Sequence, residues 1–195
     1  MSQFWLYFQL GLEHVLDWKA YDHVMFLVVL VAGYNFYSWR KVLLLVSLFT
    51  LGHTIALFLA AYQLINFKSA IVEFLIPVTI LITALYNIFT AKKRPANKGF
   101  NLLYFTTLFF GIIHGLGFST YFKMIAAGAH SKILPLLEFA LGIELAQVIV
   151  VVSVLILAFI FQNILKVNRR DWIMVASAIV IGVILPILQK AFLNL

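Results

Sequence analysis

The chain has 195 residues, of which 64% are hydrophobic and only 11% are charged, and its mean hydropathy is +1.06. Soluble domains average about 45–50% apolar and about 25% charged residues, so this composition excludes an ordinary soluble domain. The formal net charge is +7, but the basic residues stand in short gaps between apolar runs, where membrane proteins keep their topology signals. Nucleic acid is therefore not an expected partner, and the lipid bilayer is. The absence of cysteine excludes disulfides and thiolate metal ligands.

Residues 3–17 are predicted to form a short helix that lies in the membrane interface. Polar residues recur at every fourth position and give this otherwise aromatic and aliphatic helix one polar face. They are Gln9, Glu13 and Asp17. The first basic residue is Lys19, so the basic n-region of a signal peptide is missing. We expect the mature chain to be residues 1–195, folded as a single transmembrane domain.

Six membrane-spanning helices are predicted to follow, which makes the fold class an all-α, polytopic helix bundle. The spans are expected near 20–37, 41–62, 69–91, 101–126, 133–163 and 172–192. The odd-numbered loops carry nine basic residues: Arg40, Lys41, Lys92, Lys93, Arg94, Lys98, Lys166, Arg169 and Arg170. The even-numbered loops and the C-terminus carry four: Lys68, Lys123, Lys132 and Lys190. The positive-inside tendency then predicts that both termini lie outside. We expect the membrane to be the bacterial cytoplasmic (inner) membrane.

Several ionisable residues fall inside these spans at similar depths. His53, His114 and Glu144 lie mid-span, roughly 14–18 Å from the outer end at a rise of 1.5 Å per residue. Asp22 and His23 open the first span. A charged side chain at the bilayer centre costs about 2.5–3.5 kcal/mol on insertion scales, so such residues have a partner or a task. We therefore predict that these five residues meet at one level as ligands of a metal ion.

Neighbouring residues refine this prediction. Glycines flank the candidate ligands and favour the close helix packing that a shared ion requires. They are Gly52, Gly111, Gly115, Gly117 and Gly142. Glu73 either approaches the site or pairs with Lys68, and Gln147 shares a helix face with Glu144. Glu138 is expected to face the interface. Imidazole and carboxylate ligands suit divalent Ni, Co, Zn or Fe, whereas Cu(I) prefers sulfur and an all-oxygen Mg or Ca site needs no histidine.

Four segments together resemble the HupE/UreJ family of membrane proteins, which is associated with nickel and cobalt uptake. They are GLEHVLDWKAYDHVMFL (11–27), FTLGHTIAL (49–57), FGIIHGLGFS (110–119) and FALGIELAQ (139–147). In the family pattern five residues separate a His from an Asp-His pair, and here seven residues separate His14 from Asp22. The resemblance implies six spans, a permease function and metal-binding roles for His14, Asp22, His23, His53, His114 and Glu144.

Three functions remain open at this point. The favoured one is a permease for a divalent transition metal (Ni, Co or Zn), with Thr79, Thr83 and Asn87 as a polar stripe towards the cytoplasm. The second is an intramembrane metalloenzyme, such as a zinc hydrolase that acts on a lipid-like substrate, with Glu144 or Asp22 as general base. The third is a polar network that only fixes helix packing. No catalytic residue is assigned, and the oligomeric state is left undetermined.

Overall fold

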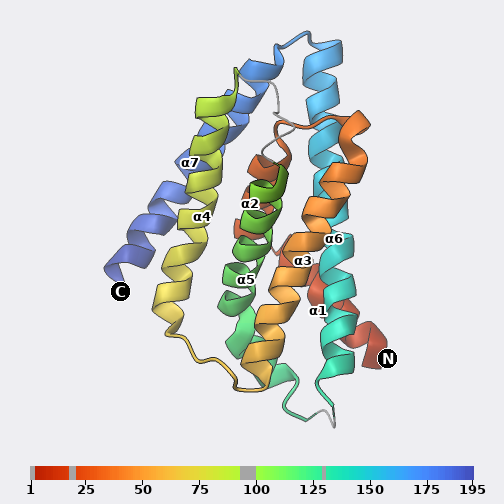
Figure 1. Ribbon diagram of the computed structural model, residues 1–195, viewed down its shortest axis with the longest axis vertical. Helices are drawn as coiled ribbons and strands as arrows, with labels where there is room; N and C mark the ends of the chain where they lie inside the picture. The colour runs from red at the N-terminus through yellow and green to blue at the C-terminus, as the bar shows by residue number, and fades with distance from the viewer. Residues whose placement is uncertain (1–2, 18–20, 93–99, 129–130) are drawn as a thin grey trace.

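The computed structural model describes residues 3–17, 21–92, 100–128 and 131–195, and all regular structure within these ranges is helical (Figure 1). The elements are α1 (Gln3–Leu16), α2 (Asp22–Val31), η1 (Phe36–Ser38), α3 (Trp39–Ala61), α4 (Ser69–Thr90), α5 (Phe100–Ile125), α6 (Ile133–Phe159), η3 (Ile160–Ile164) and α7 (Arg169–Leu193). The predicted all-α helix bundle is confirmed. Helices suit a lipid solvent because each one satisfies its backbone hydrogen bonds internally.

Five helical stretches are long and apolar enough to cross a membrane. They are Phe36–Ala61, Ser69–Thr90, Leu102–Ile125, Ile133–Ile164 and Arg169–Leu193. They correspond to the second to sixth predicted spans, so the chain is an integral membrane protein. Many of their outward-facing side chains are large and hydrophobic, as a lipid-facing surface requires.

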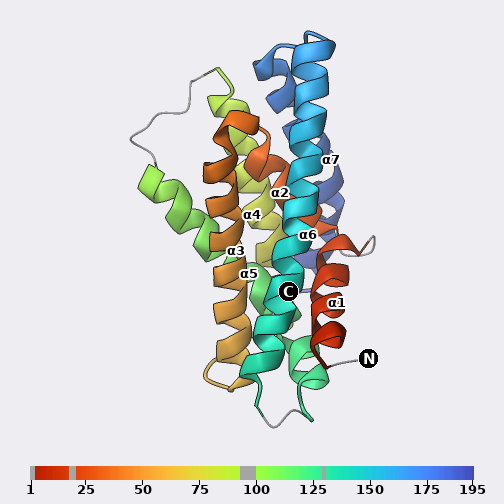
Figure 2. The same cartoon turned by 90° about the vertical axis from the view of Figure 1, so that its right-hand side faces the viewer.

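The first predicted span, 20–37, takes a different form. The helix α2 has only 10 residues, which rise roughly 15 Å and fall short of the ~30 Å hydrocarbon core. The 14-residue helix α1 packs along the first half of α6 (Figure 2). In both ribbon views α2 lies above α1, towards the end of the bundle at which α6 joins α7. Neither α1 nor α2 is thus long enough to cross the hydrocarbon core alone, and the described residues of 20–37 do not form one continuous spanning helix.

Two helix pairs, α3 with α5 and α1 with α6, pack so closely that only glycine fits at the contact. A Cβ atom there would strike a carbonyl oxygen of the facing backbone. The glycines and the residues whose carbonyl oxygens they face are Gly52 with Leu108, Gly111 with Phe49, Gly11 with Phe139 and Gly142 with Phe8. The predicted role of glycine in helix packing is thus confirmed at Gly52, Gly111 and Gly142. Gly117 is exposed, and a Cβ there would meet side-chain atoms of Ile76 and Val72 but no backbone atom of a facing helix.

A residue with positive φ follows the end of α3 and the end of η3. The last turn of α3 closes with Gln63 at φ 57°, where Gln63 N–H donates to the Ala60 carbonyl and Leu64 N–H to the Leu59 carbonyl. This is the Schellman arrangement, which satisfies otherwise unpaired carbonyl groups. At the opposite end of the bundle, α6 finishes in the π-helical turn η3, followed by Lys166 at φ 58°.

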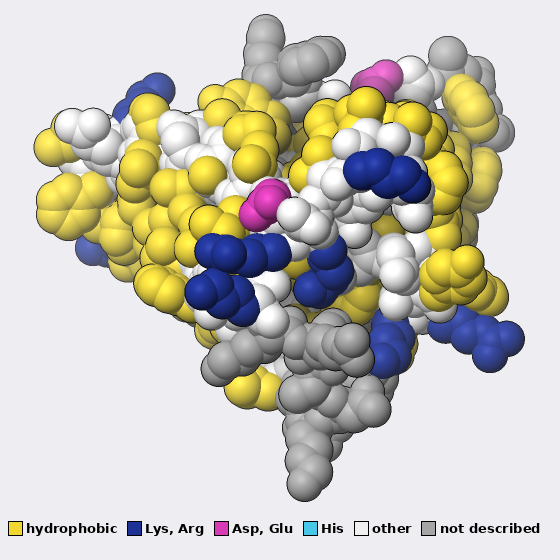
Figure 3. Space-filling model, turned by 90° about the horizontal axis from the view of Figure 1, so that it is seen from above, with side chains coloured by type: hydrophobic (Ala, Val, Ile, Leu, Met, Phe, Trp, Pro, Cys, Tyr) yellow, Lys and Arg dark blue, Asp and Glu magenta, His cyan; other side chains and the backbone are white. Residues whose placement is uncertain are grey.

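The end of the bundle at which α6 joins α7 is strongly basic. Seen from that end, Lys and Arg side chains gather over the surface (Figure 3). The described basic residues of the odd-numbered loops are Arg40, Lys41, Lys92, Lys166, Arg169 and Arg170. Lys19, Lys93, Arg94 and Lys98 lie outside the described residues. Arg169 is also structural, since its guanidinium donates to the Gly33 carbonyl at 2.9 Å and fixes the turn after α2.

Candidate metal centre

Four histidines and one aspartate converge from four different helices. His14 lies in the last turn of α1, Asp22 and His23 in the first turn of α2, His53 in α3 and His114 in α5. Their ligand atoms form two groups, within each of which all atoms lie within 4.8 Å of one another. One group is His14, His23 and His53, and the other is Asp22, His23 and His114. His23 belongs to both.

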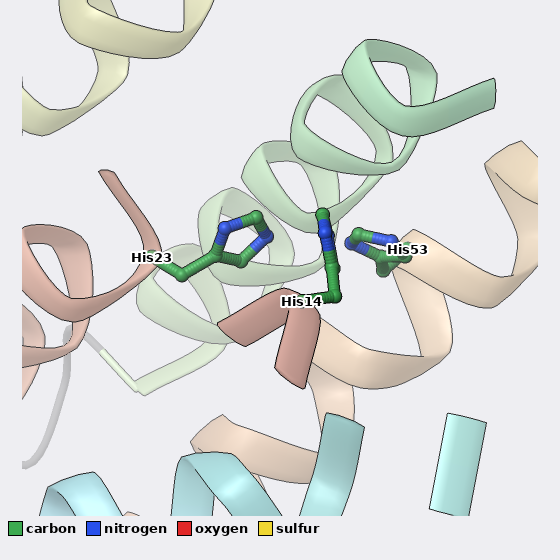
Figure 4. Close-up of side chains that lie close together, drawn as sticks. All are labelled: His14, His23 and His53. Atoms are coloured by element: carbon green, nitrogen blue, oxygen red, sulfur yellow. The ribbon is translucent and has the colours of Figure 1, made fainter. Parts of the chain in front are cut away.

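The first group is compact, and its three imidazole rings lie close together at interplanar angles of 50–70°. In Figure 4 the imidazole of His14 lies between those of His23 and His53. The ring centroids are 4.6 Å apart for His14 and His23, 5.5 Å for His14 and His53, and 5.7 Å for His23 and His53. The His114 ring lies 5.2 Å from His23 on the side of the second group.

The separation of α1 from α2 and the glycine contacts explain this convergence. The break between α1 and α2 places the end of one helix and the start of the next at the same depth, so His14 can meet His23. Close packing of α3 on α5 brings in the other two histidines, because a Cβ at Gly115 would strike the backbone of His53 itself. The predicted common level of these residues is therefore a consequence of helix packing.

Burial leaves many of the imidazole nitrogens without partners. His23, His53 and His114 are 3%, 0% and 1% exposed. His23 Nδ1 lies 3.2 Å from Asp22 Oδ1, and His114 Nε2 lies 3.3 Å from Thr79 Oγ1. Five buried nitrogens have no hydrogen-bond partner among the described residues: His14 Nε2, His23 Nε2, His53 Nδ1, His53 Nε2 and His114 Nδ1. A buried polar atom without a partner costs about 1–3 kcal/mol, so this many in one place require an explanation.

A cation fits these donors chemically. Neutral imidazole offers a nitrogen lone pair, and Asp22 adds one negative charge to the site. Two nitrogen ligands of a tetrahedral zinc-like ion lie roughly 3.4 Å apart, since each is about 2.1 Å from the metal. The observed groupings within 4.8 Å need only small inward movements of side chains to reach that spacing. The negative end of the α1 dipole, near His14, favours a cation, whereas the positive end of the α2 dipole, near Asp22 and His23, opposes one.

Aromatic rings pack against the histidine rings. The Phe118 ring lies 3.9 Å from the His14 ring, and Phe26 and Phe49 lie 5.3 and 5.1 Å from the His114 ring. Phe26 and Phe49 are fully buried. Apolar surroundings strengthen every electrostatic interaction between an ion and its ligands.

Glu144 is not brought into either group. Its Oε1 accepts a hydrogen bond of 2.6 Å from Ser47 Oγ, on a partly exposed side of α6. Gly142 faces α1, and two residues further along a helix the side chain is turned by roughly 200°, which directs Glu144 away from α1. Gln147 is fully buried, and its Oε1 accepts from Thr50 Oγ1 at 3.2 Å.

The structure places two further polar residues, Thr79 and Glu138, in buried positions. Thr79 was predicted as part of a polar stripe, and its hydroxyl is the direct neighbour of His114. Glu138, expected at the interface, is only 5% exposed, and its Oε2 has no hydrogen-bond partner. Its position four residues before Gly142 on the helix face that meets α1 was the available signal for this burial.

The model of the family described as HupE / UreJ protein matches residues 1–190, almost the whole chain. The chain belongs to the HupE/UreJ family. Searches of curated proteins and of solved structures find no significant match. HupE/UreJ membership confirms the resemblance drawn from the four sequence segments and implies a membrane protein that handles transition-metal ions. In this HupE/UreJ protein the residues of three of those segments, His14, Asp22, His23, His53 and His114, form the buried cluster.

Proposed function

We propose that this protein is a permease that binds a divalent transition-metal ion at His14, Asp22, His23, His53 and His114 and carries it across the membrane. The observation that carries the proposal is the cluster of buried imidazole nitrogens without partners, arranged in two ligand groups that share His23. Imidazole with one carboxylate suits nickel, cobalt or zinc, and family membership favours nickel or cobalt.

A polar path from the cluster towards the basic end supports transport. Thr79 lies against His114, and the Thr83 hydroxyl one turn further on donates to the Thr79 carbonyl at 2.8 Å. Another turn on, Asn87 donates to the Val29 carbonyl at 2.6 Å and so bridges α4 to α2. Their oxygen atoms can replace part of the hydration shell of a passing cation. We propose that the basic end faces the cytoplasm, as the positive-inside tendency predicts.

The hydrolase alternative has less support. Of its two candidate general bases, Glu144 is bonded to Ser47 and is absent from both ligand groups. Asp22 is itself a member of a ligand group and lies 3.2 Å from His23. Neither carboxylate is thus free beside the ligands to activate a metal-bound water.

Metal flux tests the proposed function directly. Purified protein is expected to retain about one or two Ni²⁺ or Co²⁺ ions per chain and to admit the ion into proteoliposomes that contain a metal-sensitive dye. The double variant His53→Ala/His114→Ala is expected to lose both properties, because it removes one ligand from each group. Tight stoichiometric binding without any flux would contradict the permease and favour the metalloenzyme.

The two carboxylates predicted as ligands are expected to behave differently. Asp22→Asn should weaken Co²⁺ binding by at least about tenfold, since Asp22 supplies the carboxylate of its group. Glu144→Gln should leave the dissociation constant within about twofold of wild type, because Glu144 contacts Ser47 instead. Calorimetric titration of both variants measures this difference. Equal losses of affinity would show that Glu144 reaches the ion.

A further inference from the structure

A cavity of about 370 Å³ lies between the start of α2, the first half of α4 and the last turns of α7. Its lining combines polar and apolar side chains: Tyr21, Asp22, Glu73, Ile76, Pro77, Ile184, Ile187, Lys190, Ala191 and Asn194. Asp22 is the residue that this lining shares with the metal centre. Its side chain is 25% exposed, whereas that of its neighbour His23 is 3% exposed. The cavity therefore meets the metal centre at the Asp22 carboxylate.

The charges of the cavity are arranged for a cation. Besides Asp22, the lining holds Glu73, whose Oε1 accepts a hydrogen bond of 2.6 Å from Ser69 Oγ. Lys190 is its cationic residue. Among the described residues, neither Glu73 nor Lys190 takes part in an ion pair within 4.0 Å. The expected pairing of Glu73 with Lys68 is thus not formed, and the Glu73 charge remains available to a mobile cation.

We propose that this cavity is the entry route by which a hydrated divalent cation reaches the metal centre from the outer side. Glu73 attracts the ion, Asp22 transfers it to the histidines, and Lys190 opposes its approach. The inference rests on the proposed metal-binding function and adds a path and a capture residue to it. Glu73 acts as a positioning residue for the incoming ion and is not a member of either ligand group.

The size and composition of the cavity agree with this occupant. Six water molecules of a hydrated ion occupy roughly 180 Å³ at about 30 Å³ each, so the ion can enter before it loses its water shell. Five of the ten lining residues are apolar and offer the ion no ligand, namely Ile76, Pro77, Ile184, Ile187 and Ala191. A carboxylate in a low-dielectric cleft raises the local concentration of cations and hence their association rate.

Charge variants test the route with effects of opposite sign. At low ionic strength we expect Glu73→Gln to slow Co²⁺ association by about three- to tenfold and Lys190→Gln to accelerate it by a similar factor. Stopped-flow absorbance of Co²⁺ measures the rate, and calorimetry should give unchanged stoichiometry. Both differences should shrink as salt approaches 0.2 M, because the screening length falls below about 10 Å. Glu13→Gln and Lys68→Gln are the matched controls, since both residues are exposed and lie outside the cavity lining.

A steric block gives an independent test, because the chain has no native cysteine that could react. Ala191→Cys places one thiol in the cavity lining, and a bulky water-soluble maleimide attached there should slow Co²⁺ association at least tenfold. Gly128→Cys is the control, since a side chain at Gly128 meets no atom within 4 Å and this residue does not line the cavity.

The outcomes separate the route from the function. Normal association rates in the blocked Ala191→Cys protein, or in Glu73→Gln at low salt, would overturn the entry route while leaving metal binding intact. A wild-type protein that takes up no Co²⁺ would overturn the proposed function and the route together. Slower loading with unchanged stoichiometry is the result that supports the route.

Discussion

His23→Ala is expected to abolish stoichiometric metal binding, with a larger effect than any other single ligand substitution. His23 is the residue that both ligand groups contain, so its loss leaves two unconnected pairs of ligands. Structural zinc sites gain about 10–16 kcal/mol from three or four ligands, so each ligand is worth roughly 3 kcal/mol, or about a hundredfold in affinity. Metal analysis after gel filtration, followed by calorimetric titration, measures the loss.

Comparison with neighbouring variants separates a shared ligand from general damage to the fold. His53→Ala and His114→Ala each disrupt one group and should retain weakened binding. Gln147→Leu is the matched control, because Gln147 is also fully buried and polar but belongs to neither group. It should bind metal as the wild type does. If His23→Ala still bound one ion with unchanged affinity, the shared-ligand arrangement would be wrong.

The depth of the site was predictable from the sequence, whereas its angular arrangement was only partly so. Counting helix rise put His53, His114 and Glu144 at one level, and the structure places the two histidines in separate ligand groups that share His23. Depth does not determine which way a side chain points around its helix. Glu144 has the right depth but faces Ser47. Gly142 faces α1, and this orientation would have shown that Glu144 points away from α1. The sequence alone did not identify α1 as the helix that packs against Gly142.

The sequence pattern did not predict that the first expected span would contain only the short helix α2. Residues 20–37 are apolar enough to resemble one span, yet the helix α2 covers only Asp22–Val31 and is too short to cross alone. Hydropathy averages over a window and does not detect a break within the bundle. Discontinuous helices commonly bind ions at their break in transporters, and here the two ends supply His14, Asp22 and His23. The family resemblance indicated His14 when helix periodicity alone did not.

Gly52→Ala is expected to lower both the stability and the metal affinity of the protein. A Cβ at this position would strike the carbonyl oxygen of Leu108 in α5, and a backbone atom cannot move aside by changing rotamer. Overpacking of this kind costs about 1–3 kcal/mol, which corresponds to a decrease of roughly 3–10 °C in Tm for a chain of this size. Because Gly52 precedes His53, the forced separation of α3 from α5 also moves a ligand.

Gly182→Ala distinguishes this effect from the general consequence of replacing a helical glycine. Gly182 lies in the interior of α7, and a Cβ there meets no atom within 4 Å. Alanine favours a helix over glycine by about 1 kcal/mol, so this variant should be as stable as the wild type or slightly more stable. Thermal unfolding in detergent and Co²⁺ titration of both variants give the comparison. If Gly52→Ala matched Gly182→Ala in Tm and affinity, close packing of α3 on α5 would not be what holds His53 in the metal centre.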